Sequence, residues 1–489
     1  MNASQPRRSA PSPAAKWKTR RTPPLPPLRL ALAGLLVLAA PATAQQLTPA
    51  ETARIDGVVA TALAKTGTPG VSIAVVRGGR IVLARAYGKA SEAIPQADAR
   101  LPFQIASISK QFTAAAVLLL ADQGKLSLDD TVAKYLPGIS GGDTITIREL
   151  LSHTSGLQDY WPQDYSFKAM ATPVSPQGIV DRWAKKPLDF APGTQWQYSN
   201  TGYVVAGLIV EKVSGEPLLA FLRTHIFKPL GMTPIDQDLA IGKAYPQGYG
   251  RAALGPVRAV QPPARGWLYA AGELAMTAAD LAKWDIARLD RTLLTPADWQ
   301  AQETPVKLAD GTTTGYGLGV SIGTRDGRRI VEHSGEAVGF LSENIVYPDD
   351  KAAIVVLTNS WSGDAFTAIA SGIAAVVLPP PAPDAGDAAA LTGAKALLAQ
   401  LTNGTLDRTR LTDDANYYFT PVTLGDYRTS LAPLGVPGVF EQRGKPRLRG
   451  GFVNRNYRVT YGDRSFALAT YAEPGGSGRY EQFLLSPVN

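Results

Sequence analysis

The chain has 489 residues, of which 45% are hydrophobic, and a formal net charge of +8. This length exceeds what one ordinary hydrophobic core supports, so the sequence predicts a globular protein of at least two domains. The absence of cysteine excludes disulfides, thiolate metal sites, a cysteine nucleophile and a lipid-modified cysteine. Its three histidines do not form a metal-ligand motif, and we expect no metal and no cofactor.

The first 44 residues differ from the rest. They contain seven basic and no acidic residues, then an apolar run over 30–40 and Pro-Ala-Thr-Ala before Gln45. This order predicts a cleaved secretory signal peptide over 1–44, because the apolar run is too short to span a membrane. Removing the seven basic residues lowers the charge from +8 to +1, which leaves no electrostatic case for nucleic acid binding. We expect a secreted or periplasmic bacterial protein without a stable membrane span.

The next elements are an amphipathic helix and a β-hairpin. Thr48, followed by an acid three positions later, is a helix-capping pattern, and two β-branched runs around Gly78 and Gly79 predict a hairpin over 70–88. Residues from about 107 to 310 are mainly helical, and strand-turn-strand patterns return from Tyr316. Strands at both ends of a helical middle predict an α+β domain over 45–378, with an antiparallel sheet flanked by helices and an inserted all-helical region.

A proline-rich segment over 379–389 predicts a linker. Beyond it, a helix near Leu391 to Leu401 and several strand candidates predict a small α+β accessory domain over 390–489. The stretches RGGF, YRVTYGD and YEQFLL in this region resemble the NTF2-like or cystatin-like fold. This region contains no catalytic constellation, and its role and the oligomeric state stay open.

Ser107 and Lys110 lie three positions apart at the start of an almost wholly apolar helix pattern that ends at Gly124. Residues at this spacing share one helix face, so the hydroxyl and the amine are neighbours. Burial and the positive end of the helix dipole both lower the pKa of a lysine, and a neutral amine can accept the serine proton. The pair therefore predicts a serine nucleophile that needs no histidine.

Two later motifs support this chemistry: Tyr-Ser-Asn at 198–200 and His-Ser-Gly at 333–335. With them, the chain resembles the serine β-lactamase and penicillin-binding-protein superfamily, especially its class C β-lactamase, D,D-peptidase and esterase branch. That family carries Ser-x-x-Lys, Tyr-x-Asn and Lys/His-Thr/Ser-Gly in this order. The stretches GVSIAVV, LLSHTSGL, HIFKPLGM and YGLGV extend the resemblance over about 48–378. It implies a β-lactamase/transpeptidase-like fold.

The resemblance also implies catalytic roles. Ser107 would be the acylated nucleophile, and Lys110 and Tyr198 would share the role of base, the tyrosine through a lowered pKa. Which of the two is the base stays open. Asn200 would hold the substrate amide.

The strand edge for the substrate would be formed by His333, Ser334 and Gly335, with Gly335 leaving space for it. The oxyanion would lie between the backbone N–H groups of Ser107 and Glu336. His333 replaces the lysine of the β-lactamase members, which removes a fixed charge for a drug carboxylate and favours peptidases and esterases. Glu336 would receive a substrate amine, as in an aminopeptidase, or would simply be solvated.

We therefore expect an exported serine hydrolase that forms an acyl-enzyme on Ser107 with D-amino-acid peptides, amides or esters, including peptidoglycan fragments. The alternatives are a slow-turnover penicillin-binding or cell-wall sensor protein and a true class C-type β-lactamase. An α/β-hydrolase is disfavoured, because neither Gly-x-Ser-x-Gly string, at 138–142 or at 319–323, lies on a strand-to-helix turn. His153 is expected to cap a helix and pack under the site, and His225 to be structural.

Overall fold

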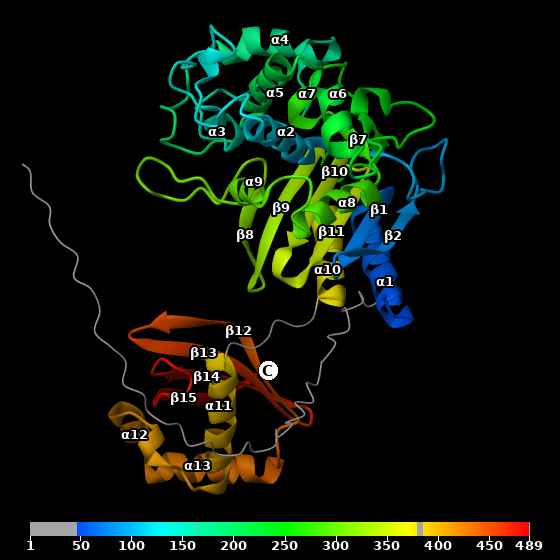
Figure 1. Cartoon of the computed structure of the whole chain (residues 1–489). Helices are drawn as coiled ribbons and strands as arrows, with labels where there is room; N and C mark the ends of the chain where they lie inside the picture. Colours follow the sequence, from blue (N-terminus) through cyan, green and yellow to red (C-terminus); the bar gives the residue numbers. More distant parts are fainter. Residues whose placement is uncertain (1–45, 164, 379–384, 489) are drawn as a thin grey trace, which may run out of the picture. The chain divides into compact units, whose positions relative to one another are not determined.

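The computed structural model describes residues 46–163, 165–378 and 385–488 (Figure 1). The predicted signal peptide over 1–44 lies outside the described residues, as does most of the predicted linker. Within the described ranges, no helix has both the length and the apolar character that crossing a membrane requires.

A six-stranded antiparallel sheet forms the centre of the region before residue 378, with the order β2-β1-β11-β10-β9-β8. Its strands are β1 (Gly70–Arg77), β2 (Arg80–Gly88), β8 (Ser321–Arg325), β9 (Arg328–Ala337), β10 (Phe340–Tyr347) and β11 (Ala352–Thr358). Strand β1 pairs directly with β11, with Val71 opposite Thr358. The prediction that strands from the two ends of this region share one sheet is confirmed.

The first elements follow their local sequence signals. Helix α1 (Pro49–Thr66) begins with a capping box in which Thr48 and Glu51 satisfy each other's backbone N–H groups. Strands β1 and β2 are joined by Gly78 and Gly79, with φ angles of 57° and 73°. Two consecutive left-handed residues are what a tight hairpin turn requires, so both predictions are confirmed.

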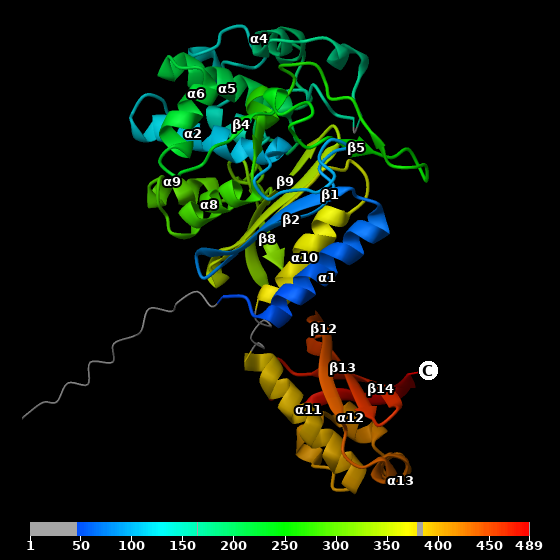
Figure 2. The same cartoon turned by 90° about the vertical axis from the view of Figure 1, so that its right-hand side faces the viewer.

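Each face of the sheet is covered by helices. Helix α1 and helix α10 (Ala365–Val377) lie side by side on one face (Figure 2), where Ile73 of β1 joins their apolar side chains in one core. The next residue along the strand, Ala74, belongs to a second core on the opposite face, together with Phe112 and Trp284. This alternation places the sheet between two helical layers.

The residues between β2 and β8 form the predicted helical region (Figure 1). Its α-helices are α2 (Lys110–Asp122), α3 (Ile147–Leu151), α4 (Pro176–Ile179), α5 (Asn200–Ser214), α6 (Leu218–Leu222), α7 (Tyr269–Gly272), α8 (Ala278–Leu289) and α9 (Pro296–Gln302). Its short strands are β3 (Phe103–Gln104), β4 (Ile235–Asp236), β5 (Tyr249–Gly250), β6 (Arg258–Ala259) and β7 (Leu274–Met276). The predicted fold class is therefore confirmed.

Helix α2 is buried almost all round, and Gly124 just beyond it has a left-handed φ of 68°. The start of the helix differs from the prediction. Ser107 lies in a 3-10 turn, η1 (Ala106–Ser109), and the α-helix itself begins at Lys110. Ala106, the first residue of this turn, has a φ of 48°, so the chain changes direction sharply between β3 and the helix.

Residues 385–488 form a four-stranded antiparallel sheet with the order β12-β13-β14-β15 and helices that share one core with it. The elements are α11 (Ala385–Asn403), α12 (Asp413–Tyr418), α13 (Pro421–Leu431), β12 (Val439–Arg449), β13 (Phe452–Tyr461), β14 (Arg464–Ala472) and β15 (Tyr480–Val488). Helix α11 begins at Ala385, so residues 385–389 are helical and not linker as predicted. Their alanine-rich sequence favours the helix. The accessory domain and its NTF2-like resemblance stay predictions.

Candidate active site

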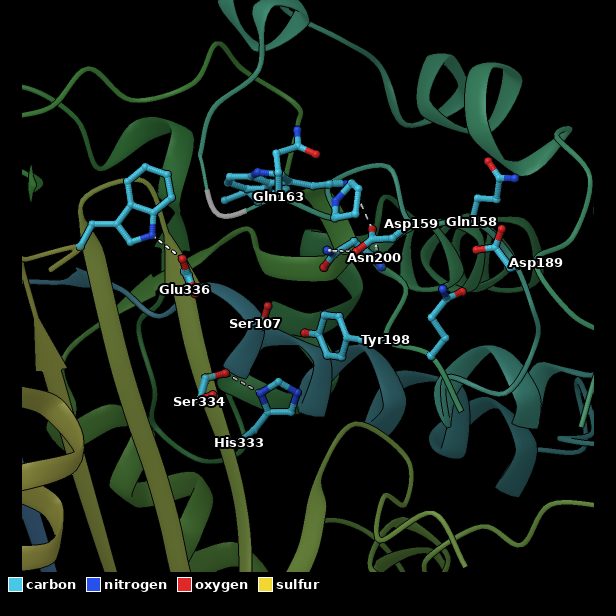
Figure 3. A pocket seen from close by; sticks show the side chains of 15 residues that line it. Ser107, Gln158, Asp159, Gln163, Asp189, Tyr198, Asn200, His333, Ser334 and Glu336 are labelled. Carbon is cyan, nitrogen blue, oxygen red and sulfur yellow. Dashed lines mark hydrogen bonds between the residues drawn. The ribbon is translucent and has the colours of Figure 1, made fainter. Parts of the chain in front are cut away.

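A cavity of about 630 Å³ lies where the start of α2 approaches strand β9 (Figure 3). It is lined by Ser107, Gln158, Asp159, Trp161, Pro162, Gln163, Asp189, Gln197, Tyr198, Asn200, Leu268, His333, Ser334, Glu336 and Trp361. Six of the eight predicted site residues are in this set. The other two are Lys110, fully buried beneath the cavity, and Gly335. The structure thus brings together three motifs that lie far apart in the sequence.

The first two motifs lie at the starts of helices α2 and α5. Ser107 lies in the 3-10 turn and Lys110 is the first residue of α2. Ser199 is the N-cap of α5, and its hydroxyl accepts a hydrogen bond from the Gly202 N–H. This cap places Tyr198 just before the helix, where its hydroxyl points toward Ser107 (Figure 3).

The Lys110 amine has three oxygen neighbours. Its Nζ lies 3.0 Å from Ser107 Oγ, 2.8 Å from Asn200 Oδ1 and 2.7 Å from the Ala271 carbonyl oxygen. The amide and the carbonyl can only accept, whereas the hydroxyl can also donate. When the amine is neutral, its two N–H groups can be donated to these two acceptors, and its lone pair is then free to accept the Ser107 hydroxyl proton.

Burial is the main cause that lowers the pKa of Lys110 to about 7, and the charge of Asp159 opposes this effect. A pKa this far below the usual lysine value allows the amine to lose its proton near neutral pH. The arrangement can activate a serine hydroxyl without an imidazole.

Asp159 was not among the predicted site residues. Its Oδ1 accepts the backbone N–H of Asn200 at 3.0 Å, and its Oδ2 accepts the Asn200 side-chain amide at 3.2 Å. These contacts turn the amide so that Asn200 Oδ1 faces Lys110. Burial raises the pKa of Asp159, while backbone N–H groups and Lys110 counteract this effect. Asp159 therefore orients Asn200 and acts electrostatically on Lys110.

The expectation that Tyr198 has a lowered pKa is wrong. Burial raises the pKa of Tyr198 well above its usual value, and its contact with Ser107 compensates only in part. Its ring lies 4.2 Å from the ring of His153, whose Nδ1 accepts the Ser199 N–H at 3.1 Å. His153 packs beneath the site, as predicted, but the residue that caps helix α3 is Ser152, directly before it. Tyr198 thus holds its proton at neutral pH and can donate it.

His333 is buried and neutral. Burial and Lys110 lower the pKa of His333 to about 3. Its Nδ1 lies 2.5 Å from the Ser334 carbonyl oxygen, so Nδ1 carries the proton, and its Nε2 accepts from the Tyr316 hydroxyl at 2.9 Å. The position that carries a lysine in the β-lactamase members therefore contributes no positive charge here.

Beyond Glu332, no strand among the described residues pairs with the outer edge of β9. The ladder between β8 and β9 runs from Arg325 opposite Arg328 to Ser321 opposite Glu332. Its pairing with β10 continues to Ala337. In an antiparallel strand, alternate residues turn their N–H and C=O groups away from one neighbour, so the segment 333–337 offers such groups toward the cavity. An extended substrate backbone can pair with this edge.

Gly335 does not leave space for a substrate, contrary to the prediction. A Cβ atom there would lie 2.1 Å from the Ile105 carbonyl oxygen and 2.2 Å from Ser342 Oγ. The missing side chain instead allows β9 to approach the start of the helix at backbone distance.

The charged residues that line the cavity are all acidic: Asp159, Asp189 and Glu336. Glu336 accepts a hydrogen bond from the Trp361 indole N–H at the cavity edge (Figure 3). Within the described residues, no group of three or more histidine, aspartate or glutamate side chains could hold a metal ion. The site therefore favours a ligand that carries positive charge.

The sequence matches the beta-lactamase family over residues 55–378. The chain belongs to this family. This match confirms the predicted family. It also confirms the predicted enzyme class, a serine hydrolase related to β-lactamases. The roles of individual residues stay predictions.

Relatives of this family member include bacterial hydrolases and penicillin-binding proteins. The chain is 31% identical to "Penicillin-binding protein 4*" of Bacillus subtilis over 59% of this chain and 67% of that protein. It is 29% identical to a D-aminopeptidase of Brucella canis over 64% of this chain and 61% of that protein. A D-stereospecific amidohydrolase from Streptomyces sp. has a TM-score of 0.58 at 28% identity, over 68% of this chain and 99% of that chain. The match thus spans about two thirds or less of the length of the penicillin-binding protein and of the D-aminopeptidase.

Sequence reasoning missed several residues of the site, among them Asp159, Trp161, Ala271 and Trp361. Asp159 and Trp161 lie in a loop before residue 167 that is rich in aromatic residues. The sequence of this loop has neither the helical nor the strand periodicity of apolar residues. Ala271 acts through its carbonyl oxygen, a group that every residue possesses. The predicted structural residue His225 lies 3.4 Å from Glu216 and does not line the cavity.

Proposed function

We propose that the protein is an exported serine hydrolase that forms an acyl-enzyme on Ser107 with D-amino-acid amides, peptides or esters. The observation that carries this proposal is the buried Lys110 amine, 3.0 Å from Ser107 Oγ and otherwise surrounded by acceptors. In acylation, Ser107 transfers its proton to Nζ of Lys110 and its Oγ attacks the substrate carbonyl carbon. The oxyanion is stabilised by the backbone N–H groups of Ser107 and Glu336.

Collapse of this intermediate requires a proton on the leaving group. The raised pKa of Tyr198 keeps its phenol protonated near Ser107, so the phenol can pass its proton to the leaving group while the Lys110 ammonium replaces that proton. The C–N or C–O bond breaks and leaves an ester on Ser107. Water then attacks the ester carbonyl carbon while Lys110 accepts a water proton. The C–Oγ bond breaks, the acid product leaves, and the Lys110 ammonium returns the proton to Ser107 Oγ. We therefore assign the role of base to Lys110 and that of donor to Tyr198.

The substrate class follows from the charges around the cavity. The lining carboxylates suit a substrate with a free amine, and the neutral His333 gives no counter-charge to a substrate carboxylate. The names of the D-aminopeptidase and the D-stereospecific amidohydrolase support the same class. A carboxylate-bearing β-lactam is a poorer match, which disfavours the class C-type β-lactamase alternative.

A substrate panel with an active-site label tests the proposal. Hydrolysis of D-amino-acid amides and esters is expected from the wild type, with L-isomers and cephalosporins slower. Ser107→Ala and Lys110→Met, a substitution of similar length, are each expected to lose at least about 1,000-fold in kcat/KM. A fluorescent penicillin should label Ser107 transiently. A stable label without turnover of any substrate would instead favour the slow-turnover sensor, and a label on another residue would overturn the proposal.

A further inference from the structure

The residue before Ser107 has a strained backbone. Ala106 has a φ of 48°, a left-handed conformation that is unfavourable for a residue with a side chain. Such conformations cost about 1–3 kcal/mol and persist only where neighbouring contacts hold them. The contacts of Ile105 and Ala106 therefore decide where Ser107 lies.

Ser342 of strand β10 supplies one of these contacts. Its hydroxyl oxygen lies 3.1 Å from the Ile105 carbonyl oxygen and 3.3 Å from the Gly335 carbonyl oxygen, so its single hydrogen is shared between the two acceptors in a three-centre hydrogen bond. On the opposite side, the Ile105 N–H donates to the Leu274 carbonyl at 3.0 Å. Ser342 is buried and lies opposite Gly335 in the β9–β10 ladder. Its hydroxyl thus lies between the start of the helix and strand β9.

The two carbonyl groups belong to residues close to the proposed oxyanion donors. Ile105 is two residues before Ser107, and Gly335 directly precedes Glu336. Gly335 packs against Ile105 without an intervening side chain. The separation between the two backbone N–H groups therefore depends on how firmly these carbonyl groups are held.

We propose that Ser342 is a positioning residue, which sets the spacing of the two oxyanion donors by holding the Ile105 and Gly335 carbonyl groups with one hydroxyl. Ser342 is not among the residues that line the cavity, so it acts without touching the substrate. The inference rests on the proposed function, because it requires acylation at Ser107.

A second contact two residues along β10 keeps the helix in place when Ser342 is changed. Asn344 lies on the same face as Ser342, and its Oδ1 accepts from Gln111 Nε2 of α2 at 2.9 Å. Gln111 is also bonded to Trp284 at 3.0 Å and Arg288 at 2.9 Å through its Oε1. Loss of the Ser342 hydroxyl should therefore disturb the turn at Ala106 and leave the rest of α2 bound to the sheet.

The test compares Ser342→Ala with Thr358→Val. Thr358 is a matched control, because its buried hydroxyl also donates to a backbone carbonyl, that of Leu341 in β10, at 2.8 Å, and it does not line the cavity. For each variant, kcat and KM for a neutral ester, the inhibition constant of a boronic acid and the thermal midpoint are measured. The boronic acid forms a tetrahedral adduct with a serine oxygen and so reports on the oxyanion site.

Ser342→Ala is expected to lower kcat about 10- to 100-fold and to weaken the boronic acid by a similar factor, with KM nearly unchanged. Thr358→Val is expected to lower the thermal midpoint comparably while both kinetic constants stay within about twofold. Should Ser342→Ala fold poorly, the added change Ala106→Gly relieves the strained φ and restores stability without restoring kcat.

Two results would overturn the inference: kinetic constants of Ser342→Ala within twofold of wild type, or an equal loss of kcat in Thr358→Val. Failure of the proposed function has a different signature. In that case the boronic acid does not inhibit the wild type, and Ser107→Ala retains its activity.

Discussion

The charge of Asp159 should control the pH at which the enzyme becomes active. Lys110 must lose its proton before it can accept that of Ser107, so kcat/KM should rise with pH through the Lys110 pKa of about 7. Asp159 favours the protonated amine and raises this pKa. The change Asp159→Asn removes the charge and retains an oxygen that can accept the N–H of Asn200. Its effect is a lower Lys110 pKa and activity at lower pH.

The size of the effect follows from the contacts between the two groups. Asn200 bridges them, 2.8 Å from Lys110 Nζ and 3.2 Å from Asp159 Oδ2. With the width of one amide group, the charges are roughly 7 Å apart, and at an effective dielectric constant of about 20 they interact by roughly 2 kcal/mol. This energy corresponds to a decrease of about 1.5 in the pKa of Lys110.

The assay is the pH profile of kcat/KM for an uncharged ester, which reports the pKa of the free enzyme. For Asp159→Asn, the acidic limb should move to lower pH by about 1 to 2 pH units. Asp189→Asn serves as a control, because it also removes a cavity carboxylate but does not contribute to the pKa shift of Lys110. An unchanged limb in Asp159→Asn, or a move to higher pH, would refute Lys110 as the base.

Three further changes probe other parts of the site and the core. Tyr198→Phe removes the proposed proton donor, so hydrolysis of amides should fall at least about 100-fold while an activated ester with a good leaving group is affected much less; equal losses would argue against the donor role. Gly335→Ala forces a Cβ atom to within 2.1 Å of the Ile105 carbonyl oxygen, so both activity and thermal midpoint should drop sharply, and normal kinetics would contradict the close approach of β9 to the helix. Burial raises the pKa of Asp285 to about 7, so this carboxyl stabilises the folded state at low pH and that contribution is lost as pH rises through 7. In the wild type, this group should lower the unfolding free energy by up to about 1.4 kcal/mol per pH unit between pH 4 and 7, and Asp285→Asn should abolish this dependence. Denaturant unfolding at several pH values measures the slope, and an unaltered slope would show that Asp285 is ionised throughout.

The elements that the sequence predicted are those with strong local signals. The capping box at Thr48, the glycine pair of the first hairpin and the apolar pattern of α2 each act within a few residues, and all three are present in the structure. Their energies depend on backbone conformation and neighbouring side chains, so no tertiary information was needed.

The start of α2 shows where such local reasoning stops. The sequence predicted a regular α-helix from Ser107, whereas the 3-10 turn depends on contacts of Ile105 with β7 and β10. The pKa of Tyr198 was predicted in the wrong direction for a similar reason. The cationic neighbours were foreseen, but the full burial of the ring, which dominates its pKa, was not.

The sequence alone determined which chemistry is available: a serine and a lysine one turn apart, a tyrosine with an asparagine two places later, and a strand that ends in His-Ser-Gly. Only the tertiary structure decided how these groups are tuned. Asp159 and the carbonyl of Ala271 reach Lys110 and Asn200 from segments far away in the chain. Burial and long-range contacts set the protonation states, because desolvation depends on what the whole fold places around a group.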